Sequence, residues 1–118
     1  MKIGSIVIHC HEFDRTVAFW QDALRYVPRA PARGGWVVLR DPEGRGPNLS
    51  FQARDTPRRN RGWIHLDLYT SKRDEEVERL LALGATRYPW RYRSTADYVV
   101  LQDPDGNLFC VVQKAGVT

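Results

Sequence analysis

Two residues of this chain, His65 and Asp67, have side chains that could move a proton. A histidine changes its charge near neutral pH, and a carboxylate beside it can orient the ring or accept its proton. They alternate with Ile64, Leu66 and Leu68, and this period of two is typical of a β-strand. Residues two apart on a strand point the same way without necessarily touching. His65 and Asp67 are therefore the best candidates for catalytic residues, and the sequence leaves open whether there is a reaction.

The same alternation separates polar from apolar residues in two similar strands. Residues 2–10 read KIGSIVIHC and residues 63–70 read WIHLDLYT. We expect the apolar sets, which include Ile6, Ile8, Leu66 and Leu68, to be buried under helices, since a one-residue slip would exchange the faces. The polar sets then line an open, concave face. Together with later strands they give the candidate ligand-binding residues Ser5, His9, Gln52, His65, Asp67, Tyr69, Trp90 and Cys110.

An internal repeat explains why these strands resemble each other. Residues 36–44 read WVVLRDPEG and residues 98–106 read YVVLQDPDG, an offset of 62 positions (98 minus 36). Each phrase is an apolar strand that runs into a turn, because Pro fixes φ, Asp bonds the backbone and Gly accepts a positive φ. Upstream the match continues at an offset near 60. A unit of about sixty residues is too long for a solenoid repeat and indicates two copies of one module.

Each module is expected to have the order βαβββ within a single domain, residues 1–118. Module one spans 2–53, a linker spans 54–61, and module two spans 62–114. The expected strands are 2–10, 27–32, 36–40 and 48–53, then 63–70, 87–93, 97–102 and 108–113. The first expected helix spans 14–25, is capped by Asp14 and has an apolar face of Phe13, Val17, Trp20 and Leu24. The second spans 72–83, has a capping box at 71–74 and an apolar face of Val77, Leu80 and Leu81, and ends at Gly84. The fold class is α+β, and two half-covered sheets would form a curved cleft.

The segment 87–93 alternates arginines with aromatic residues. Tyr88, Trp90 and Tyr92 would share one face of a strand, and the arginines would share the other. An aromatic face on the cleft would stack on a planar ligand, whereas an arginine face would bind an anion. The sequence does not decide which face lines the cleft.

Composition excludes several classes of protein. The net charge is +4, but the arginines are scattered, and no nucleic-acid-binding motif accompanies them, so we expect no nucleic-acid partner. No apolar run reaches the roughly 20 residues of a membrane helix, and no signal peptide is evident, so we expect no membrane association and a cytoplasmic location. Two cysteines, Cys10 and Cys110, each inside an expected strand, indicate free thiols.

Three features of the sequence occur together: the duplicated βαβββ order, Leu83-Gly84-Ala85, and the ending Asp103-Pro104-Asp105-Gly106-Asn107-Leu108-Phe109. In these features the chain resembles the vicinal oxygen chelate superfamily, which includes glyoxalase, bleomycin resistance proteins and extradiol dioxygenases. The resemblance covers residues 2–114. It implies the glyoxalase/bleomycin resistance fold and a homodimer whose cleft is built from paired modules. Since one such scaffold hosts lyases, isomerases, dioxygenases and binding proteins, it does not assign a reaction.

The resemblance also implies where a metal would sit. Glyoxalase-like enzymes take one ligand from the first and one from the last strand of each module, which corresponds here to Ser5, Gln52, His65 and Cys110. Ser5 is a poor ligand, and Cys110 replaces a carboxylate by a thiol, which favours a softer metal such as zinc. We therefore expect no metal cofactor. The alternative is a divalent ion (Zn, Ni, Fe or Mn) held by His65 and Gln52, with His9 in a rebuilt site.

The function predicted from the sequence is that of a glyoxalase-like protein which binds a small aromatic or anionic molecule in a concave cleft. The protein is expected to be a homodimer and to need no catalytic metal. The alternative is a metal-dependent lyase, isomerase or dioxygenase.

Overall fold

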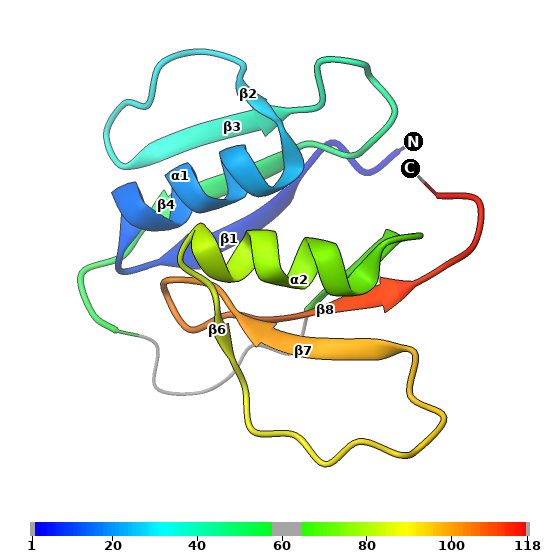
Figure 1. The fold of residues 1–118 in the computed structure, drawn as a ribbon. Coiled ribbons are helices and arrows are strands. Elements are labelled where there is room, and N and C mark those ends of the chain that lie inside the picture. The colour runs from blue at the N-terminus through cyan, green and yellow to red at the C-terminus, as the bar shows by residue number, and fades with distance from the viewer. Residues whose placement is uncertain (1, 58–64, 118) are drawn as a thin grey trace. The chain divides into compact units, whose positions relative to one another are not determined.

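A computed structural model describes residues 2–57 and 65–117 of the chain (Figure 1). The chain divides into two compact units, Met1–Arg59 and Asn60–Thr118. The first unit contains β1 (Ile6–Cys10), α1 (Phe13–Leu24), β2 (Val27–Pro28), β3 (Trp36–Arg40) and β4 (Leu49–Ala53). The second contains β5 (Leu66–Thr70), α2 (Arg73–Ala82), β6 (Thr86–Arg87), β7 (Tyr98–Gln102) and β8 (Leu108–Gln113). Both units have the predicted βαβββ order.

The two sheets have the same topology. The strand order is β1-β4-β3-β2 in the first and β5-β8-β7-β6 in the second. In each, the first strand runs parallel to the last, and the other pairs are antiparallel. The register also repeats, because Ile6 lies opposite Leu49 and Leu66 lies opposite Phe109, both at an offset of 60 (66 minus 6, 109 minus 49). The α+β fold of two tandem modules is confirmed.

The repeated Asp-Pro phrase forms the turn after β3 and after β7. Oδ1 of the buried Asp103 accepts hydrogen bonds from the backbone N–H groups of Asp105 and Asn107, at 2.9 and 2.8 Å. Its Oδ2 accepts a third bond from the Asn107 side chain at 2.8 Å. Asp41 accepts hydrogen bonds in the same way from the backbone N–H groups of Glu43, Arg45 and Gly46. These bonds lower the pKa of the Asp41 carboxyl, and the bond from Glu43 contributes most. Both carboxylates thus stabilise the turns that return the chain to the central strand of each sheet.

The helices differ in detail from the sequence predictions. The buried stripe of α1 is Thr16, Phe19, Trp20 and Ala23, whereas Phe13, Val17 and Leu24 are only half-buried at its margins. The predicted caps are wrong, since α1 begins after Glu12, α2 begins after Lys72, and neither N-cap residue makes a side-chain capping bond. Instead, Gln113 of β8 accepts the backbone N–H of Arg73, a tertiary contact that local spacing does not encode. Gly84 ends α2 as predicted, with φ at +118°.

The predicted faces of the first strands are confirmed, although their burial is incomplete. Ile6, Ile8, Leu66 and Leu68 are half-buried, while Val7, His9, Asp67 and Tyr69, which alternate with them, are exposed. In the second unit α2 packs on β8, β5 and β7, so the helix covers one face of that sheet (Figure 1). The residues stay half-buried because β1 and β5 are edge strands of their sheets.

The predicted strand at 87–93 is wrong beyond its first residue. Only Thr86 and Arg87 form a strand, β6, at the edge of the second sheet. The N–H of Tyr88 still bonds the Val100 carbonyl, but Pro89 has no N–H with which to continue the ladder. Residues 88–93 therefore leave the sheet as an irregular segment. The expected strands at 2–10 and 27–32 are likewise shorter. Of the expected strand at 63–70, residues 66–70 form β5, and residues 63 and 64 lie outside the described residues, as do residues 58–62.

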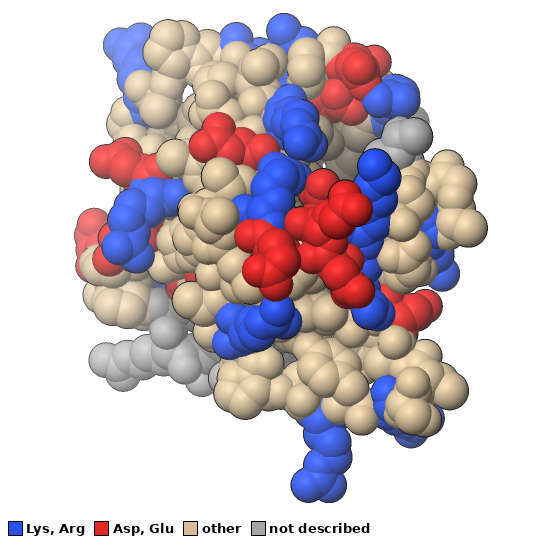
Figure 2. Space-filling model, viewed as in Figure 1, with Lys and Arg blue, Asp and Glu red and all other residues tan. Residues whose placement is uncertain are grey.

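Charges of both signs lie side by side on α2. The acidic residues of its first turn, Asp74 to Glu76, lie between Arg73 and Arg79 in the sequence, and Figure 2 shows blue and red side chains intermingled where α2 lies in Figure 1. Arg79 pairs with Glu76 at 2.6 Å, and Arg87 pairs with Glu78 at 3.3 Å. Charges of opposite sign on and beside α2 therefore partly neutralise one another. Among the described residues, no helix combines the length and apolar character needed to cross a bilayer.

Removal of the Asp103 carboxylate should destabilise the fold. Asp103→Ala leaves three donors without their acceptor in a buried turn, so we expect the free energy of unfolding to fall by about 3 kcal/mol. Urea unfolding monitored by circular dichroism measures this loss. The matched control is Asp41→Ala, the same turn in the other module, whose carboxylate is less buried and whose loss should be smaller. Equal losses in both variants would contradict this account.

Candidate functional site

The face of the second sheet opposite α2 carries an open pocket with a volume of about 440 Å³. Strands β5, β7 and β8 supply most of its lining, because every second residue of each strand points to this face. Asp67 lies opposite Cys110, and Cys110 opposite Val100, so their side chains form one row across three strands. Tyr69, Val112 and Tyr98 form the next row. The pocket is lined by His65, Asp67, Tyr69, Trp90, Asp97, Tyr98, Val100, Leu108, Cys110, Val112 and Lys114.

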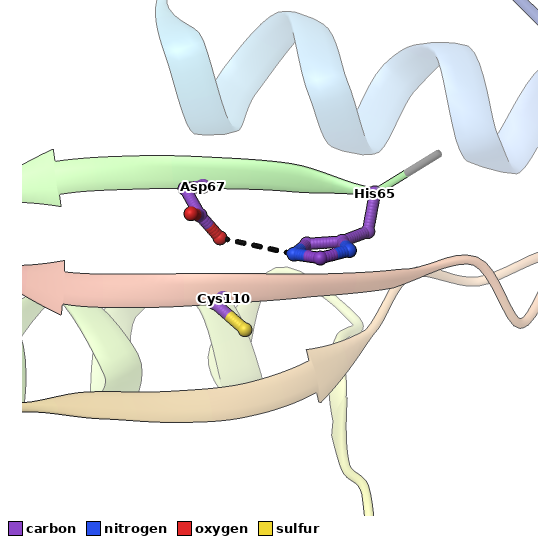
Figure 3. A group of neighbouring side chains, drawn as sticks. All are labelled: His65, Asp67 and Cys110. Atoms are coloured by element: carbon purple, nitrogen blue, oxygen red, sulfur yellow. Dashed lines mark ion pairs between the residues drawn. The ribbon is translucent and has the colours of Figure 1, made fainter. Parts of the chain in front are cut away.

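A cluster of His65, Asp67 and Cys110 lies at one end of this pocket. His65 immediately precedes β5, and its Nε2 lies 3.2 Å from Oδ1 of Asp67. Cys110 stands beside them on β8 (Figure 3). One imidazole nitrogen, one carboxylate oxygen and the sulfur all lie within 4.8 Å of one another. The predicted pair of His65 and Asp67 is therefore in contact, which strand alternation alone did not establish.

The arrangement of these three side chains does not activate the Cys110 thiol. Burial first, and then the charge of Asp67 and a hydrogen bond to it, raise the pKa of Cys110. An activated cysteine needs a cationic or basic neighbour that stabilises its thiolate, whereas Asp67 stabilises the protonated thiol. His65 is held against Asp67 rather than placed between the carboxylate and the sulfur. The cluster consequently favours proton transfer or metal binding over nucleophilic attack by Cys110.

Aromatic side chains form the wall of the pocket on the β7 side. The Trp90 indole N–H donates to the Tyr98 hydroxyl at 3.1 Å, which fixes the two side chains relative to each other. The Tyr92 hydroxyl accepts the backbone N–H of Val100 at 2.8 Å, and its ring packs on that of Tyr98 with centroids 5.6 Å apart. These bonds hold the irregular segment after β6 against the sheet. Trp90 keeps 49% of its surface exposed, so its ring is available to a ligand.

The other end of the pocket carries one cation. Lys114 Nζ lies 5.3 Å from the centroid of the Tyr69 ring, within the range of a cation–π interaction. Val112 lies in the row between this end and the cluster, Val100 shares a row with Asp67 and Cys110, and Leu108 precedes Cys110 on the same face of β8. The pocket thus combines an apolar floor, an aromatic wall and polar groups at both ends, as is common for small-molecule sites.

Five of the eight candidate ligand-binding residues line this pocket: His65, Asp67, Tyr69, Trp90 and Cys110. Ser5, His9 and Gln52 belong to the first unit, and the pocket is built entirely from the second. Sequence reasoning missed Val112 and Lys114, although they follow Cys110 at the same alternate spacing. Asp97 and Leu108 carried no comparable signal.

Register corrects the position assigned to Gln52 in the repeat. Val7 lies opposite Ser50 as Asp67 lies opposite Cys110, so Ser50 and not Gln52 is the counterpart of Cys110. Gln52 lies opposite His9 and donates its Nε2 hydrogen to the Gly35 carbonyl at 3.0 Å. The counterparts of the cluster in the first unit are therefore Ser5, Val7 and Ser50, and the two serine hydroxyls bond each other at 2.5 Å. This set has no ionisable side chain.

The chain matches proteins of known structure over almost its whole length. A variant of the fosfomycin resistance protein FosX of Listeria monocytogenes, complexed with Mn(II) and 1S,2S-dihydroxypropylphosphonic acid, is 18% identical, with a TM-score of 0.76 and coverage of 98% of this chain and 91% of that one. A glyoxalase/bleomycin resistance protein/dioxygenase family enzyme of Burkholderia phytofirmans PsJN is also 18% identical, with a TM-score of 0.72 and coverage of 94% and 97%. At these identities the likeness shows the fold alone.

The sequence itself matches a family. No curated protein matches it. The glyoxalase-like domain family, however, matches residues 5–112, which include both modules. The chain therefore belongs to the glyoxalase-like domain family of the vicinal oxygen chelate superfamily.

Proposed function

We propose that this protein binds a small aromatic or anionic molecule in the pocket on the helix-free face of its second sheet. One observation carries the proposal: Trp90 and Tyr98, joined by a hydrogen bond, line the same pocket as the apolar side chains of β7 and β8 and the polar groups of His65, Asp67 and Lys114. A planar ligand would bury its ring against Trp90 and the floor. Its polar or negatively charged group would face Lys114 or His65.

For the segment 87–93, the lining of the pocket favours an aromatic face over an arginine face as the one that meets the ligand. Trp90 lines the pocket, whereas Arg87, Arg91 and Arg93 are not among its lining residues and are exposed. The attraction for an anion then rests on Lys114, because His65 is paired with Asp67. A single cation, Lys114, in a pocket whose lining also includes Asp97, fits a ligand with one acidic group better than a polyanion.

A second candidate function, a metal-dependent reaction, is favoured by the cluster of His65, Asp67 and Cys110. Three donor atoms within 4.8 Å of one another fit a cation with three protein ligands, and a bound cation would polarise an oxygen of the ligand. His65 and Cys110 would hold it, with Asp67 in place of the Gln52 expected from the sequence. Without a cation, His65 and Asp67 can exchange a proton with a ligand at the same end of the pocket.

We also propose that the modules act as one domain and that the protein is a C2 homodimer. Support comes from apolar side chains exposed on the helix-free face of the first sheet, Val7 at 47% and Trp36 at 38%. A second copy would cover these two side chains, and a two-fold dimer is the commonest assembly of soluble proteins.

The homodimer has a direct test. Light scattering of the purified protein at micromolar concentration should give twice the chain mass of 13.6 kDa. A monomer mass under these conditions would contradict the proposal of a dimer and leave that of the pocket unaffected.

The aromatic wall should control affinity. A thermal-shift screen of small aromatic acids, such as benzoate and 4-hydroxybenzoate, against their neutral amides identifies a ligand for titration calorimetry. Trp90→Ala should weaken its binding about tenfold, since an aromatic contact contributes about 1 kcal/mol beyond the area it buries. Trp36→Ala, an exposed tryptophan of the first unit, should leave affinity unchanged. Unchanged affinity in Trp90→Ala, or an equal loss in Trp36→Ala, would contradict the assignment of the site to this pocket.

A further inference from the structure

We propose that the pocket recognises an aromatic acid from both ends. Lys114 binds its one acidic group, and Asp67 accepts a hydrogen bond from a donor at the para position of the ring. The inference rests on the proposed function, because it requires that the pocket of the second unit binds an aromatic molecule. It names the class of that molecule as a para-hydroxy or para-amino aromatic acid with a single negative charge.

The acidic and the basic end of the pocket lie two strand repeats apart. Asp67 lies opposite Cys110, and Lys114 follows Cys110 by four residues (114 minus 110). The backbone N–H of Lys114 donates to the Thr70 carbonyl at 2.8 Å, so strand geometry continues to this residue. Four residues of a β-strand span about 13 Å. The backbone therefore holds the row of Asp67 and the row of Lys114 about that far apart.

This separation fits one benzene ring with polar groups at opposite positions. A hydrogen bond of about 2.8 Å at each end leaves roughly 7 Å between the polar atoms of the ligand. The two para substituents of one ring come close to this span, whereas ortho and meta substituents lie closer together. Val112 lies in the row between the two ends and gives the ring an apolar surface, and Trp90 lines the same pocket.

Asp67 has acceptor positions that its neighbours leave unused. Its Oδ1 lies 3.2 Å from His65 Nε2, and the Cys110 thiol also bonds its carboxylate (Figure 3). An ionised carboxylate offers about four lone-pair sites on two oxygens, so two partners do not saturate it. The side chain is 48% exposed, which lets a ligand approach. A hydroxyl or amino group of the ligand can donate to it, whereas a methoxy group cannot.

The same carboxylates reject ligands with more negative charge. A second carboxylate at the para position would face Asp67, and like charges in contact oppose binding. Asp97 belongs to the other end, because its carbonyl accepts the N–H of Gln113, the neighbour of Lys114, at 2.7 Å. Lys114 is thus the one cation at an end that also carries a carboxylate, among the described residues that line the pocket. This charge pattern selects a monoanion.

A series of benzoate derivatives tests the class of ligand on the full chain. Titration calorimetry in the presence of a chelator measures each affinity. We expect 4-hydroxybenzoate to bind about tenfold more tightly than benzoate, 4-methoxybenzoate or 3-hydroxybenzoate, since a hydrogen bond to a charged group contributes about that factor. The neutral 4-hydroxybenzamide should lose a similar factor, and terephthalate, with a carboxylate at both ends, should bind more weakly than benzoate.

Two variants separate the two ends. Asp67→Ala should make the affinities of 4-hydroxybenzoate and benzoate equal while keeping the preference for the acid over the amide. Lys114→Met should abolish the preference for the acid while keeping that for the hydroxyl. Asp74→Ala and Lys72→Met, which change the same charges at α2, should keep both preferences, because α2 covers the opposite face of the sheet. Circular dichroism shows whether each variant is folded.

The proposal is overturned if benzoate and 4-hydroxybenzoate bind equally to the unmodified protein, or if terephthalate binds as tightly as 4-hydroxybenzoate. It is also overturned if folded Asp67→Ala still prefers the hydroxyl. Trp90→Ala separates this failure from that of the proposed function. Equal binding of all the acids, weakened by Trp90→Ala, would refute recognition of the para group and leave the aromatic pocket standing.

Discussion

The parallel pairing of β5 with β8 is the constraint on which the site depends. It sets Asp67 opposite Cys110 and Tyr69 opposite Val112, so that side chains forty-three positions apart in the sequence (110 minus 67) become neighbours. The helix α2 covers the other face of this sheet, which leaves the polar set on the open side. A shift of one residue in this register would move His65, Asp67 and Tyr69 under the helix and bring Leu66 and Leu68 to the pocket. Burial of those leucines therefore specifies the position of the polar residues as well.

Duplication made the fold predictable, because each module supports the interpretation of the other. The two Asp-Pro phrases predicted equivalent turns, and the structure has an aspartate accepting backbone N–H groups in both. The faces of the first strands followed from alternation, which needs no tertiary information. The helix caps did not, since the N–H of Arg73 bonds Gln113 of β8, a residue forty positions away. Alternation was also misleading at 88–93, where Pro89 and the bonds of Tyr92 and Trp90 hold an irregular segment instead of a strand.

The candidate site was predictable in part for the same reason. Strand alternation predicts that His65, Asp67, Tyr69 and Cys110 point to the same face of the sheet. In the structure all four line one pocket. The contact of His65 with Asp67, and the position of Cys110 beside both, depend on side-chain conformation and strand register, which a single sequence does not contain. Counting along the chain also misplaced the counterpart of Cys110 by two residues, because turns and strands of the first module differ in length from those of the second. The two modules keep one backbone plan, yet only the second carries ionisable groups at these positions.

Amide chemical shifts in the protein labelled with nitrogen-15 would test most directly whether the helix-free face of the second sheet is the binding face. The measurement compares spectra with and without the best aromatic acid. We predict that, within the second unit, the changes concentrate on residues 65–69, 98–100 and 108–114 and on the side-chain N–H of Trp90, while the outward residues of α2 keep their shifts. Changes centred on α2 or β6, with the Trp90 signal unmoved, would contradict the account.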